Sequence, residues 1–197
     1  MTKTLYLMRH GQTLFNKRHR IQGWCDAPLT DLGVYQAQVA GQYFKNAGIT
    51  FDAAYSSTSE RACDTLEIVT NGSLPYQRVK GLKEWNFGTF EGESEDLNPP
   101  LPYEDFFVTY GGESQEQVQA RMAATILQLM QETKGKSVLM VSHGGAMANF
   151  ARAWEDNWRL DNLGHMTNCG ILKFSFEDDQ FYLEEAIGHD FSGWEEK

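Results

Sequence analysis

The sequence lacks long apolar runs and contains few cysteines. No apolar stretch approaches the ~20 residues that a helix needs to cross a bilayer, so no membrane partner is expected. The three cysteines, Cys25, Cys63 and Cys169, are odd in number and widely spaced, without a metal-type pattern, which predicts a reducing, cytoplasmic environment. Met1-Thr2-Lys3 runs straight into an apolar segment, so no signal peptide is expected either.

Positive charge is also scarce. The chain has 17 Lys and Arg residues against 27 Asp and Glu residues, a formal net charge of −10. This balance disfavours nucleic acid or an anionic membrane as the main partner, so any anion site must be a local basic patch. The one dense basic cluster is Lys17-Arg18-His19-Arg20, which is either a solvated loop or a contributor to phosphate attraction.

The length of 197 residues and a hydrophobic content of 41% predict one folded domain over residues 1–197. Apolar strands alternate with amphipathic helices along the chain. The predicted strands are 5–8, 51–57, 74–79 and 137–141, and the predicted hairpin pairs 171–176 with 181–187. The predicted helices are 31–47, 60–70, 103–110 and 144–158, together with a long helix that opens at 111–114 and carries an apolar stripe as far as Met130. This order predicts an α/β three-layer sandwich whose central sheet is mostly parallel, with an antiparallel edge.

Two of the predicted strands end in the same way. The strand at 5–8 runs into Arg9-His10-Gly11, and the strand at 137–141 runs into Ser142-His143-Gly144. Ligands of open α/β sheets bind just past the carboxyl ends of strands, so both histidines should emerge at one sheet edge. Alone, each motif could simply be part of a surface turn. Together they predict a site in which His10 is a nucleophile and Arg9 binds an anion.

Two further charged residues occupy similar places. Arg61 falls in the first turn of the helix after strand 51–57, where free N–H groups already attract anions; otherwise it is an exposed arginine paired with Asp64 or Glu60. Glu84 stands among large apolar residues, a setting that raises the pKa of a carboxyl group and suits a proton donor; otherwise it is a plain surface carboxylate.

These five residues supply the parts that phosphoryl transfer needs. His10 would attack phosphorus, while Arg9, Arg61 and a protonated or donating His143 would hold the phosphoryl oxygens. Glu84 would protonate the leaving oxygen and then accept a proton from the water that hydrolyses the phosphohistidine.

The chain resembles the histidine phosphatase superfamily, in its phosphoglycerate-mutase-like branch. The matching segments are Arg9-His10-Gly11-Gln12-Thr13 with Asn16, Ser57 with Arg61-Ala62 and Thr65, Leu82-x-Glu84 with Phe87-Gly88 and Glu91-Gly92, Gly111-Gly112-Glu113-Ser114 with Arg121, and Ser142-His143-Gly144-Gly145. The resemblance implies a phosphohistidine at His10, proton donation by Glu84, a pocket completed by Arg9, Arg61 and His143, and neither a metal nor a cofactor. It also implies supporting contacts to substrate from Asn16, Gln22, Gly23, Gly144 and Asn168.

One departure from the family pattern lies beside Arg61. The family often has Pro or Leu before this arginine, whereas this chain has Thr58-Ser59-Glu60. Glu60 either weakens phosphate binding or points away on the helix surface.

The sequence favours a phosphatase over a mutase. Related mutases carry a longer insertion with paired arginines before the second histidine, whereas between Glu84 and His143 this chain has only Arg121 and many acidic residues. A cofactor-dependent phosphoglycerate mutase is the second candidate function.

Two further alternatives remain open. One is a metal site of His10, His143 and Glu84, which the two arginines would disfavour because they repel a cation; the other is a non-catalytic phosphate-binding module. A cap segment at about 85–112 is expected to set specificity for a small phosphomonoester, whose identity the sequence leaves open together with the oligomeric state.

Overall fold

The computed structural model describes residues 2–161, 163–164 and 166–195. Its centre is one mixed sheet in the order β3-β2-β4-β1-β5-β6. The strands are β1 (Lys3–Arg9), β2 (Ala53–Ser57), β3 (Gln77–Val79), β4 (Ser137–Ser142), β5 (Ile171–Glu177) and β6 (Gln180–Ile187). The first four strands of that order pair in parallel, and β5 and β6 add an antiparallel edge. The predicted fold class is confirmed.

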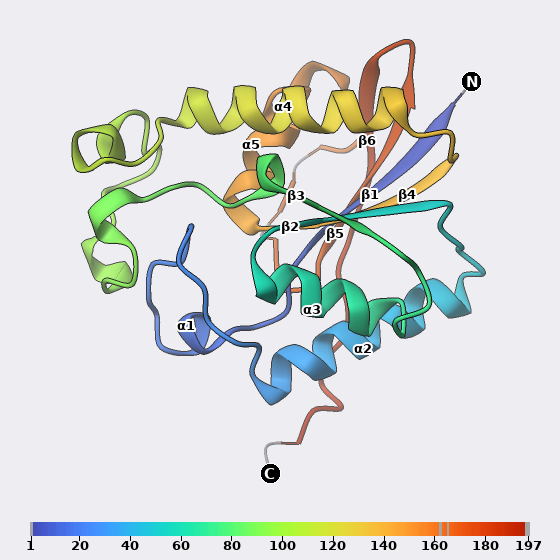
Figure 1. The fold of residues 1–197 in the computed structure, drawn as a ribbon, viewed down its shortest axis with the longest axis horizontal. Helices are drawn as coiled ribbons and strands as arrows, with labels where there is room; N and C mark the ends of the chain where they lie inside the picture. The colour runs from blue at the N-terminus through green and yellow to red at the C-terminus, as the bar shows by residue number, and fades with distance from the viewer. Residues whose placement is uncertain (1, 162, 165, 196–197) are drawn as a thin grey trace.

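Helices cover both faces of this sheet (Figure 1). They are α1 (Leu14–Lys17), α2 (Asp31–Asn46), α3 (Glu60–Val69), α4 (Gln115–Glu132) and α5 (Gly144–Arg152). Along β1, Leu5 and Leu7 join the apolar cluster under α4 and α5, whereas Tyr6 and Met8 join the one under α2 and α3. The strand is a continuous apolar run because both of its faces are buried.

Two elements are shorter than predicted. β3 covers only the last three residues of the expected strand, since Pro75 has no N–H for a ladder. α5 ends at Arg152 rather than near Trp158 because the chain folds back there. The carbonyl of Ala151, near the end of the helix, accepts from the backbone N–H of Trp154 at 3.0 Å and from the indole of Trp158 at 2.9 Å.

The large apolar residues that repeat at helical spacing along α2 are not its most buried residues. Its large apolar residues Leu32, Tyr35, Val39 and Tyr43 are only half-buried. The residues that are buried are Gly33, Gln36, Ala37, Ala40 and Phe44. Small side chains let the helix approach its neighbours closely: a Cβ on Gly33 would lie 2.0 Å from the carbonyl oxygen of Gln12.

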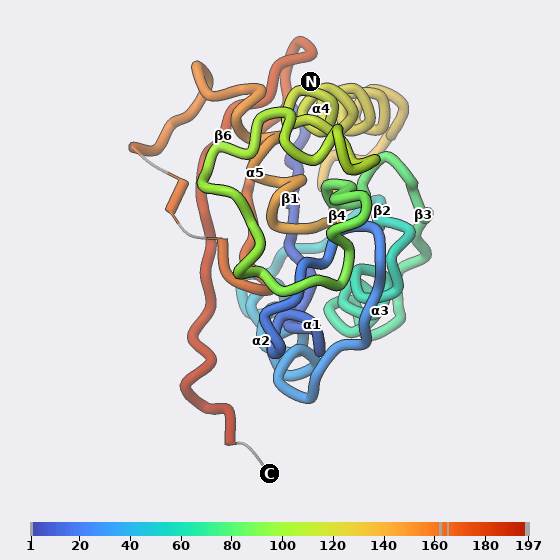
Figure 2. The backbone as a smooth tube through the Cα atoms, turned by 90° about the vertical axis from the view of Figure 1, so that its left-hand side faces the viewer, coloured from blue at the N-terminus to red at the C-terminus, as the bar shows by residue number. Residues whose placement is uncertain are grey.

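Residues 85–112 form an irregular segment beside the sheet edge, at the left of Figure 1 and facing the viewer in Figure 2. It contains the 3₁₀ turns η2 (Gly88–Phe90), η3 (Glu95–Leu97) and η4 (Phe106–Tyr110), the last of which replaces an expected short helix. Backbone hydrogen bonds of Ile21 with Gly92 and Glu93 tie it to the loop after α1. None of the helices within the described ranges is long and apolar enough to cross a membrane.

Candidate active site

His10 follows β1 and is buried at the sheet edge. Its Nδ1 lies 2.7 Å from the carbonyl oxygen of Gly11, an acceptor only, so Nδ1 carries the proton and Nε2 keeps its lone pair. Burial lowers the pKa of His10 well below its usual value, and the charges of Arg61 and Arg9 lower it further. The imidazole is therefore neutral at pH 7, which is the form that can attack an electrophile.

His143 follows β4 and caps α5, and its ring centroid lies 5.2 Å from that of His10. Burial lowers the pKa of His143 well below its usual value, with Arg61 and His10 adding to the effect, so the protonated form allowed by the sequence is disfavoured. Its Nε2 lies 2.8 Å from the hydroxyl of Ser57. When this hydroxyl donates, Nδ1 carries the ring proton and can donate to a ligand.

Arg61 is fully buried, with 0% of its surface exposed, so the reading as an exposed arginine is wrong. Its Nη1 donates to the carbonyl of Cys25 and to Asp26 Oδ1, and its Nη2 donates to the carbonyl of Gly23. Asp26 Oδ2 also accepts from the backbone N–H of Glu60, so an aspartate already occupies the N-terminus of α3. The Glu60 side chain is exposed and lies outside the cavity lining.

Glu84 is only 7% exposed, but its neighbours are not simply apolar. Oε1 accepts from the backbone N–H groups of Trp85 and Ala146, at 2.8 and 2.6 Å, and Oε2 accepts from that of Gly145 at 2.9 Å. The first turn of α5 therefore holds the carboxylate in place. Oε2 accepts one hydrogen bond, whereas Oε1 accepts two. Oε2 is therefore the oxygen better able to exchange a proton.

Arg121, on α4, holds the loop that carries Glu84. Its Nη1 donates to the carbonyls of Gly81 and Lys83, and its Nη2 donates to the carbonyl of Glu84. Nε and Nη2 also bind the two carboxylate oxygens of Glu113 at 2.8 Å each. Three of the five guanidinium N–H groups therefore hold the backbone before and at Glu84, and the other two bind Glu113. The sequence grouped Arg121 with a motif but assigned it no role at the site.

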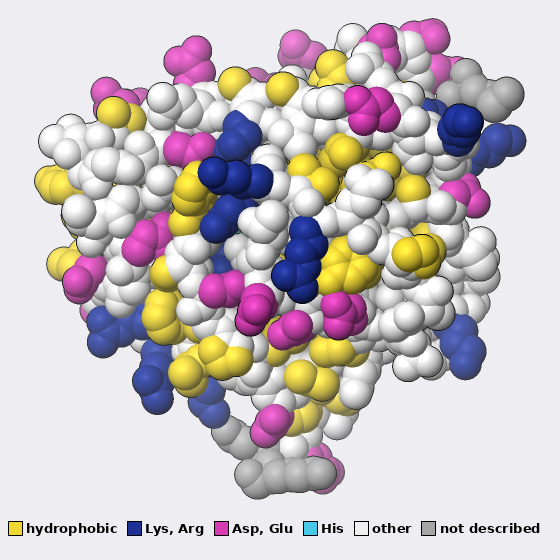
Figure 3. All heavy atoms as spheres, in the orientation of Figure 1, with side chains coloured by type: hydrophobic (Ala, Val, Ile, Leu, Met, Phe, Trp, Pro, Cys, Tyr) yellow, Lys and Arg dark blue, Asp and Glu magenta, His cyan; other side chains and the backbone are white. Residues whose placement is uncertain are grey.

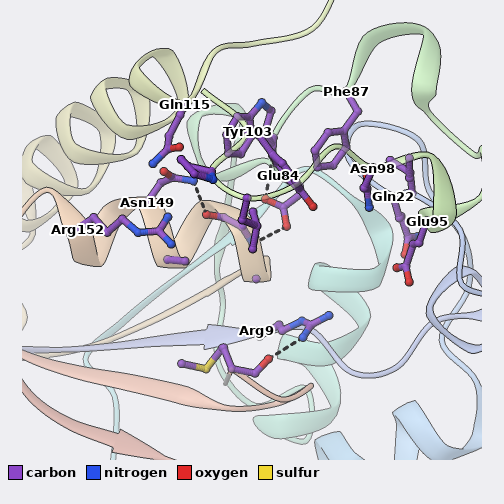
Figure 4. A pocket seen from close by; sticks show the side chains of 18 of the residues that line it. Arg9, Gln22, Glu84, Phe87, Glu95, Asn98, Tyr103, Gln115, Asn149 and Arg152 are labelled. Atoms are coloured by element: carbon purple, nitrogen blue, oxygen red, sulfur yellow. Dashed lines mark hydrogen bonds between the residues drawn. The ribbon is translucent and has the colours of Figure 1, made fainter. Parts of the chain in front are cut away.

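A cavity of about 820 Å³ opens at this edge of the sheet (Figure 4). Six of the predicted site residues line it: Arg9, His10, Asn16, Gln22, Glu84 and Gly144. His143, Arg61, Gly23 and Asn168 lie behind this surface. Asn168 Nδ2 donates to the carbonyl of His10 at 3.1 Å, and Gly23 packs so tightly that a Cβ would lie 2.1 Å from the carbonyl oxygen of Trp85.

Four buried side-chain nitrogens around His10 have no hydrogen-bond partner within the described part of the chain. They are Arg9 Nε, Arg61 Nε, His143 Nδ1 and Gln22 Nε2. Buried polar groups in native proteins are nearly always paired, so several convergent unpaired donors need an acceptor. Two guanidinium groups make an anion the acceptor of choice. The arrangement is suited to bind a phosphoryl group next to Nε2 of His10.

The basic cluster after β1 contributes one residue to the cavity. Arg20 lines it, with Nη1 3.4 Å from the carbonyl oxygen of Gly92. His19 instead pairs with Glu95 at 3.5 Å. Lys and Arg side chains gather over α1 at the lower left of Figure 3, on a surface with many acidic groups elsewhere.

The alternative metal site of His10, His143 and Glu84 finds no support in the geometry. Among the described residues, no group of three His, Cys, Asp or Glu side chains is arranged to hold a metal ion. Both oxygens of Glu84 are bonded to backbone amides.

Comparison with known proteins agrees with this geometry. The chain is 32% identical to a 2,3-bisphosphoglycerate-dependent phosphoglycerate mutase of Allorhizobium ampelinum over 98% of this chain and 99% of the relative. A phosphoglycerate mutase structure from Bacillus anthracis superposes with a TM-score of 0.81 at 29% identity, covering 93% of this chain and 92% of that one. A phosphoserine phosphatase from Entamoeba histolytica, in complex with 3-phosphoglyceric acid, gives a TM-score of 0.74 at 27% identity, covering 94% of this chain and 97% of that one.

The family model of the histidine phosphatase superfamily (branch 1) matches residues 5–187. These relatives include both phosphatases and mutases. The match spans nearly the whole chain and includes every residue of the site described above. This chain therefore belongs to the histidine phosphatase superfamily.

Proposed function

We propose that this protein is a phosphomonoester phosphatase that acts through a phosphohistidine on His10. Nε2 of His10 attacks phosphorus, and the bond between phosphorus and the leaving oxygen breaks. The electron pair stays on that oxygen, which takes a proton from Oε2 of Glu84. Arg9, Arg61 and the Nδ1–H of His143 stabilise the charge on the phosphoryl oxygens as the transfer proceeds.

The second half of the reaction frees the enzyme. A water molecule attacks phosphorus, gives one proton to Glu84, and displaces Nε2 of His10 as the phosphorus–nitrogen bond breaks. His10 keeps its Nδ1 proton throughout because the carbonyl of Gly11 lies 2.7 Å away. Both groups return to their starting protonation states, so neither a metal nor a cofactor is required.

The observation that carries this proposal is the set of four unpaired buried nitrogens beside a neutral histidine. An anion at that place would pair donors that are otherwise left without acceptors, and Nε2 of His10 is the nucleophile next to it. The three unbridged cysteines of the described structure support a cytoplasmic location. Residues 85–112, which supply part of the cavity wall, are proposed to act as the cap that selects a small phosphorylated metabolite.

Mutase activity is a second candidate because the curated relative named above is a phosphoglycerate mutase. The phosphatase is preferred since the segment between Glu84 and His143 contains a single arginine, and all of its N–H groups are engaged by Glu113 and the loop of Glu84. Rapid formation of 2-phosphoglycerate from 3-phosphoglycerate, with a trace of 2,3-bisphosphoglycerate, would reverse this preference.

The test is to trap the intermediate. Wild-type protein mixed with a radiolabelled phosphomonoester and quenched in alkali should carry label on His10. His10→Ala should lose the label and lower kcat on the order of 10³-fold or more. His19→Ala, at an exposed histidine outside the cavity, is the control and should keep both. Turnover that survives in His10→Ala, or the absence of turnover with any phosphomonoester, would contradict the proposal.

A further inference from the structure

The side chain of Arg61 is held by a short irregular stretch, residues 23–26, which contains neither helix nor strand. Nη1 donates to the carbonyl of Cys25 at 2.9 Å and to Asp26 Oδ1 at 2.8 Å, and Nη2 donates to the carbonyl of Gly23 at 2.8 Å. Nε has no partner among the described residues and is left for a ligand. The direction in which Arg61 presents Nε is therefore set by the conformation of this stretch.

One side chain, the half-buried carboxylate of Glu91, holds the backbone of that stretch. Oε1 accepts from the N–H of Trp24 at 2.7 Å, and Oε2 accepts from those of Gly23 and Cys25 at 3.0 Å each. Oε1 also accepts from the N–H of Phe87 at 3.1 Å. Within the described ranges, no backbone carbonyl accepts from the three N–H groups of residues 23–25. Glu91 therefore replaces the backbone partners that a helix or a sheet would supply.

The link from Glu91 to Arg61 passes through a rigid unit. The N–H of Trp24 and the carbonyl of Gly23 belong to the same planar peptide group. The hydrogen bond from this N–H to Glu91 therefore orients the carbonyl that accepts from Arg61 Nη2. The approach is also close: a Cβ on Gly23 would lie 2.5 Å from Glu91 Oε1, so only glycine fits there.

A second route leads from Glu91 toward Glu84. The indole N–H of Trp24 donates to the carbonyl of Glu84 at 3.0 Å. That carbonyl also accepts from Arg121 Nη2 at 3.1 Å, and the first turn of α5 holds the Glu84 carboxylate. Glu84 thus has supports that do not depend on Glu91, whereas the carbonyl that holds Arg61 Nη2 is oriented by Glu91 itself.

We propose that Glu91 is a positioning residue that fixes the direction in which Arg61 presents its guanidinium to the phosphoryl group. Donors of an anion site contribute most when their direction is set before the ligand arrives. Loss of the Glu91 carboxylate should therefore weaken phosphate binding without removing any group that touches the phosphate. The proposal rests on the phosphate-binding role that the proposed function gives to Arg61.

The test is phosphate binding, which needs no turnover. In Glu91→Gln one oxygen remains, but the amide N–H groups face two of the four backbone donors. Calorimetry with inorganic phosphate should show a dissociation constant about 5- to 30-fold larger in Glu91→Gln than in the unaltered protein. The sign is informative, because removing a negative charge near an anion site would by itself strengthen anion binding.

Glu93→Gln is the matched control. Glu93 lies two residues from Glu91, is exposed, and stays outside the cavity lining, so the substitution removes the same charge without touching residues 23–26. It should change the phosphate dissociation constant by less than about 2-fold. An unchanged or smaller dissociation constant in Glu91→Gln, or an equal increase in Glu93→Gln, would contradict the proposal.

A double-mutant cycle tests the route through Arg61. In an Arg61→Ala background the group that Glu91 positions is gone, so Glu91→Gln should change the phosphate dissociation constant by less than about 2-fold further. A further loss as large as in the unaltered background would mean that Glu91 acts elsewhere.

A pair of substrates tests the same route without a second substitution. If Glu91 acts through Arg61, Glu91→Gln should lower kcat/KM for an alkyl phosphate and for 2,4-dinitrophenyl phosphate by the same factor, within about 3-fold. A loss confined to the alkyl phosphate would assign Glu91 to the positioning of the proton donor Glu84 and contradict the proposal. This comparison decides the route if Arg61→Ala does not fold.

Folding of each variant is checked by far-UV circular dichroism and urea unfolding. If Glu91→Gln is not folded, Glu91→Asp takes its place, since it keeps the charge but draws the carboxylate away from its four donors. The same weakening of phosphate binding is expected, and unchanged binding in Glu91→Asp would contradict the proposal.

The outcomes also separate this proposal from the proposed function. Phosphate binding that depends on Glu91 through Arg61, in a protein that labels His10, supports both. A labelled His10 with unchanged phosphate binding in Glu91→Gln contradicts only the positioning role. Phosphate binding that depends on Glu91, in a protein that neither labels His10 nor hydrolyses any phosphomonoester, supports the positioning role and contradicts the hydrolytic mechanism.

Discussion

At the scale of single residues, hydrogen bonds decide which nitrogen of each imidazole is free. The carbonyl of Gly11 fixes the proton of His10 on Nδ1 and leaves the lone pair of Nε2 free, as the proposed attack requires. The hydroxyl of Ser57 does the reverse for His143 when it donates to Nε2, because the ring proton then lies on Nδ1. In the proposed mechanism, the two neighbouring neutral histidines take opposite roles: His10 attacks phosphorus and His143 donates to its oxygens.

Ser57 should therefore matter to catalysis although it lies outside the cavity lining. In Ser57→Ala the ring of His143 loses the partner that sets its tautomer, and we expect kcat/KM for p-nitrophenyl phosphate to fall about 3- to 10-fold. Ser56→Ala is a matched control because the Ser56 hydroxyl is also buried but has no partner. Urea unfolding of both variants separates catalysis from stability. An equal loss of kcat/KM in the two variants would contradict the role of Ser57.

At the scale of elements, the loop of residues 81–86 is held from two sides. α4 supplies Arg121, which binds three carbonyls of the loop, and the first turn of α5 supplies two N–H groups to the Glu84 carboxylate. Glu84 thus has a fixed position relative to His10, because two helices hold the loop that carries it. Arg121 is a positioning residue, since it acts through Glu84 rather than on substrate.

Arg121→Lys should therefore mimic loss of the general acid. Lysine cannot reproduce the planar fork, so Glu84 shifts, and we expect kcat/KM for an alkyl phosphate to fall about 10- to 100-fold. For 2,4-dinitrophenyl phosphate, whose leaving group needs no proton, the change should stay within about 3-fold. The measurement is the ratio of the two kcat/KM values.

Arg159→Lys is the control for this experiment, because Arg159 forms an ion pair with Glu184 away from the loop. It should leave the ratio unchanged. Equal losses for both substrates in Arg121→Lys would mean that the arginine only stabilises the fold.

At the scale of the whole molecule, residues 85–112 share the core that lies under α4 and α5. Phe107 is fully buried in that core and meets the rings of Phe87, Tyr103 and Phe106 at centroid distances of 4.8, 5.3 and 5.1 Å. Because the segment and the sheet share one apolar cluster, they should unfold together.

Phe107→Ala tests this coupling. Loss of the ring should lower the free energy of unfolding by about 3–5 kcal/mol, and tryptophan fluorescence and far-UV circular dichroism should report one shared urea midpoint. Val108→Ala is the control, since Val108 is 45% exposed and should change stability by less than about 0.5 kcal/mol. Two separate midpoints in Phe107→Ala would show that the segment folds independently.

The sequence alone determined which strands end at the site. Continuous apolar runs predict strands buried on both faces, and parallel strands end at the same edge of a sheet, so the sequence places His10 and His143 close together. The N-cap at Thr30, which accepts from the N–H of Gly33, and the capping box of Ser114 with Gln117 are likewise local features. Such features are readable because they depend on residues only a few positions apart.

Only the tertiary structure decided what surrounds those side chains. It pairs Arg61 with Asp26 and holds the carboxylate of Glu84 against the N–H groups of the first turn of α5. It also buries Gly33, Ala37 and Ala40 of α2 together with Phe44, and leaves Leu32 and Tyr35 half-buried. Periodicity tells which face of an element can be buried, but hydrogen-bond partners from remote loops depend on how the elements pack in space, which no local pattern contains.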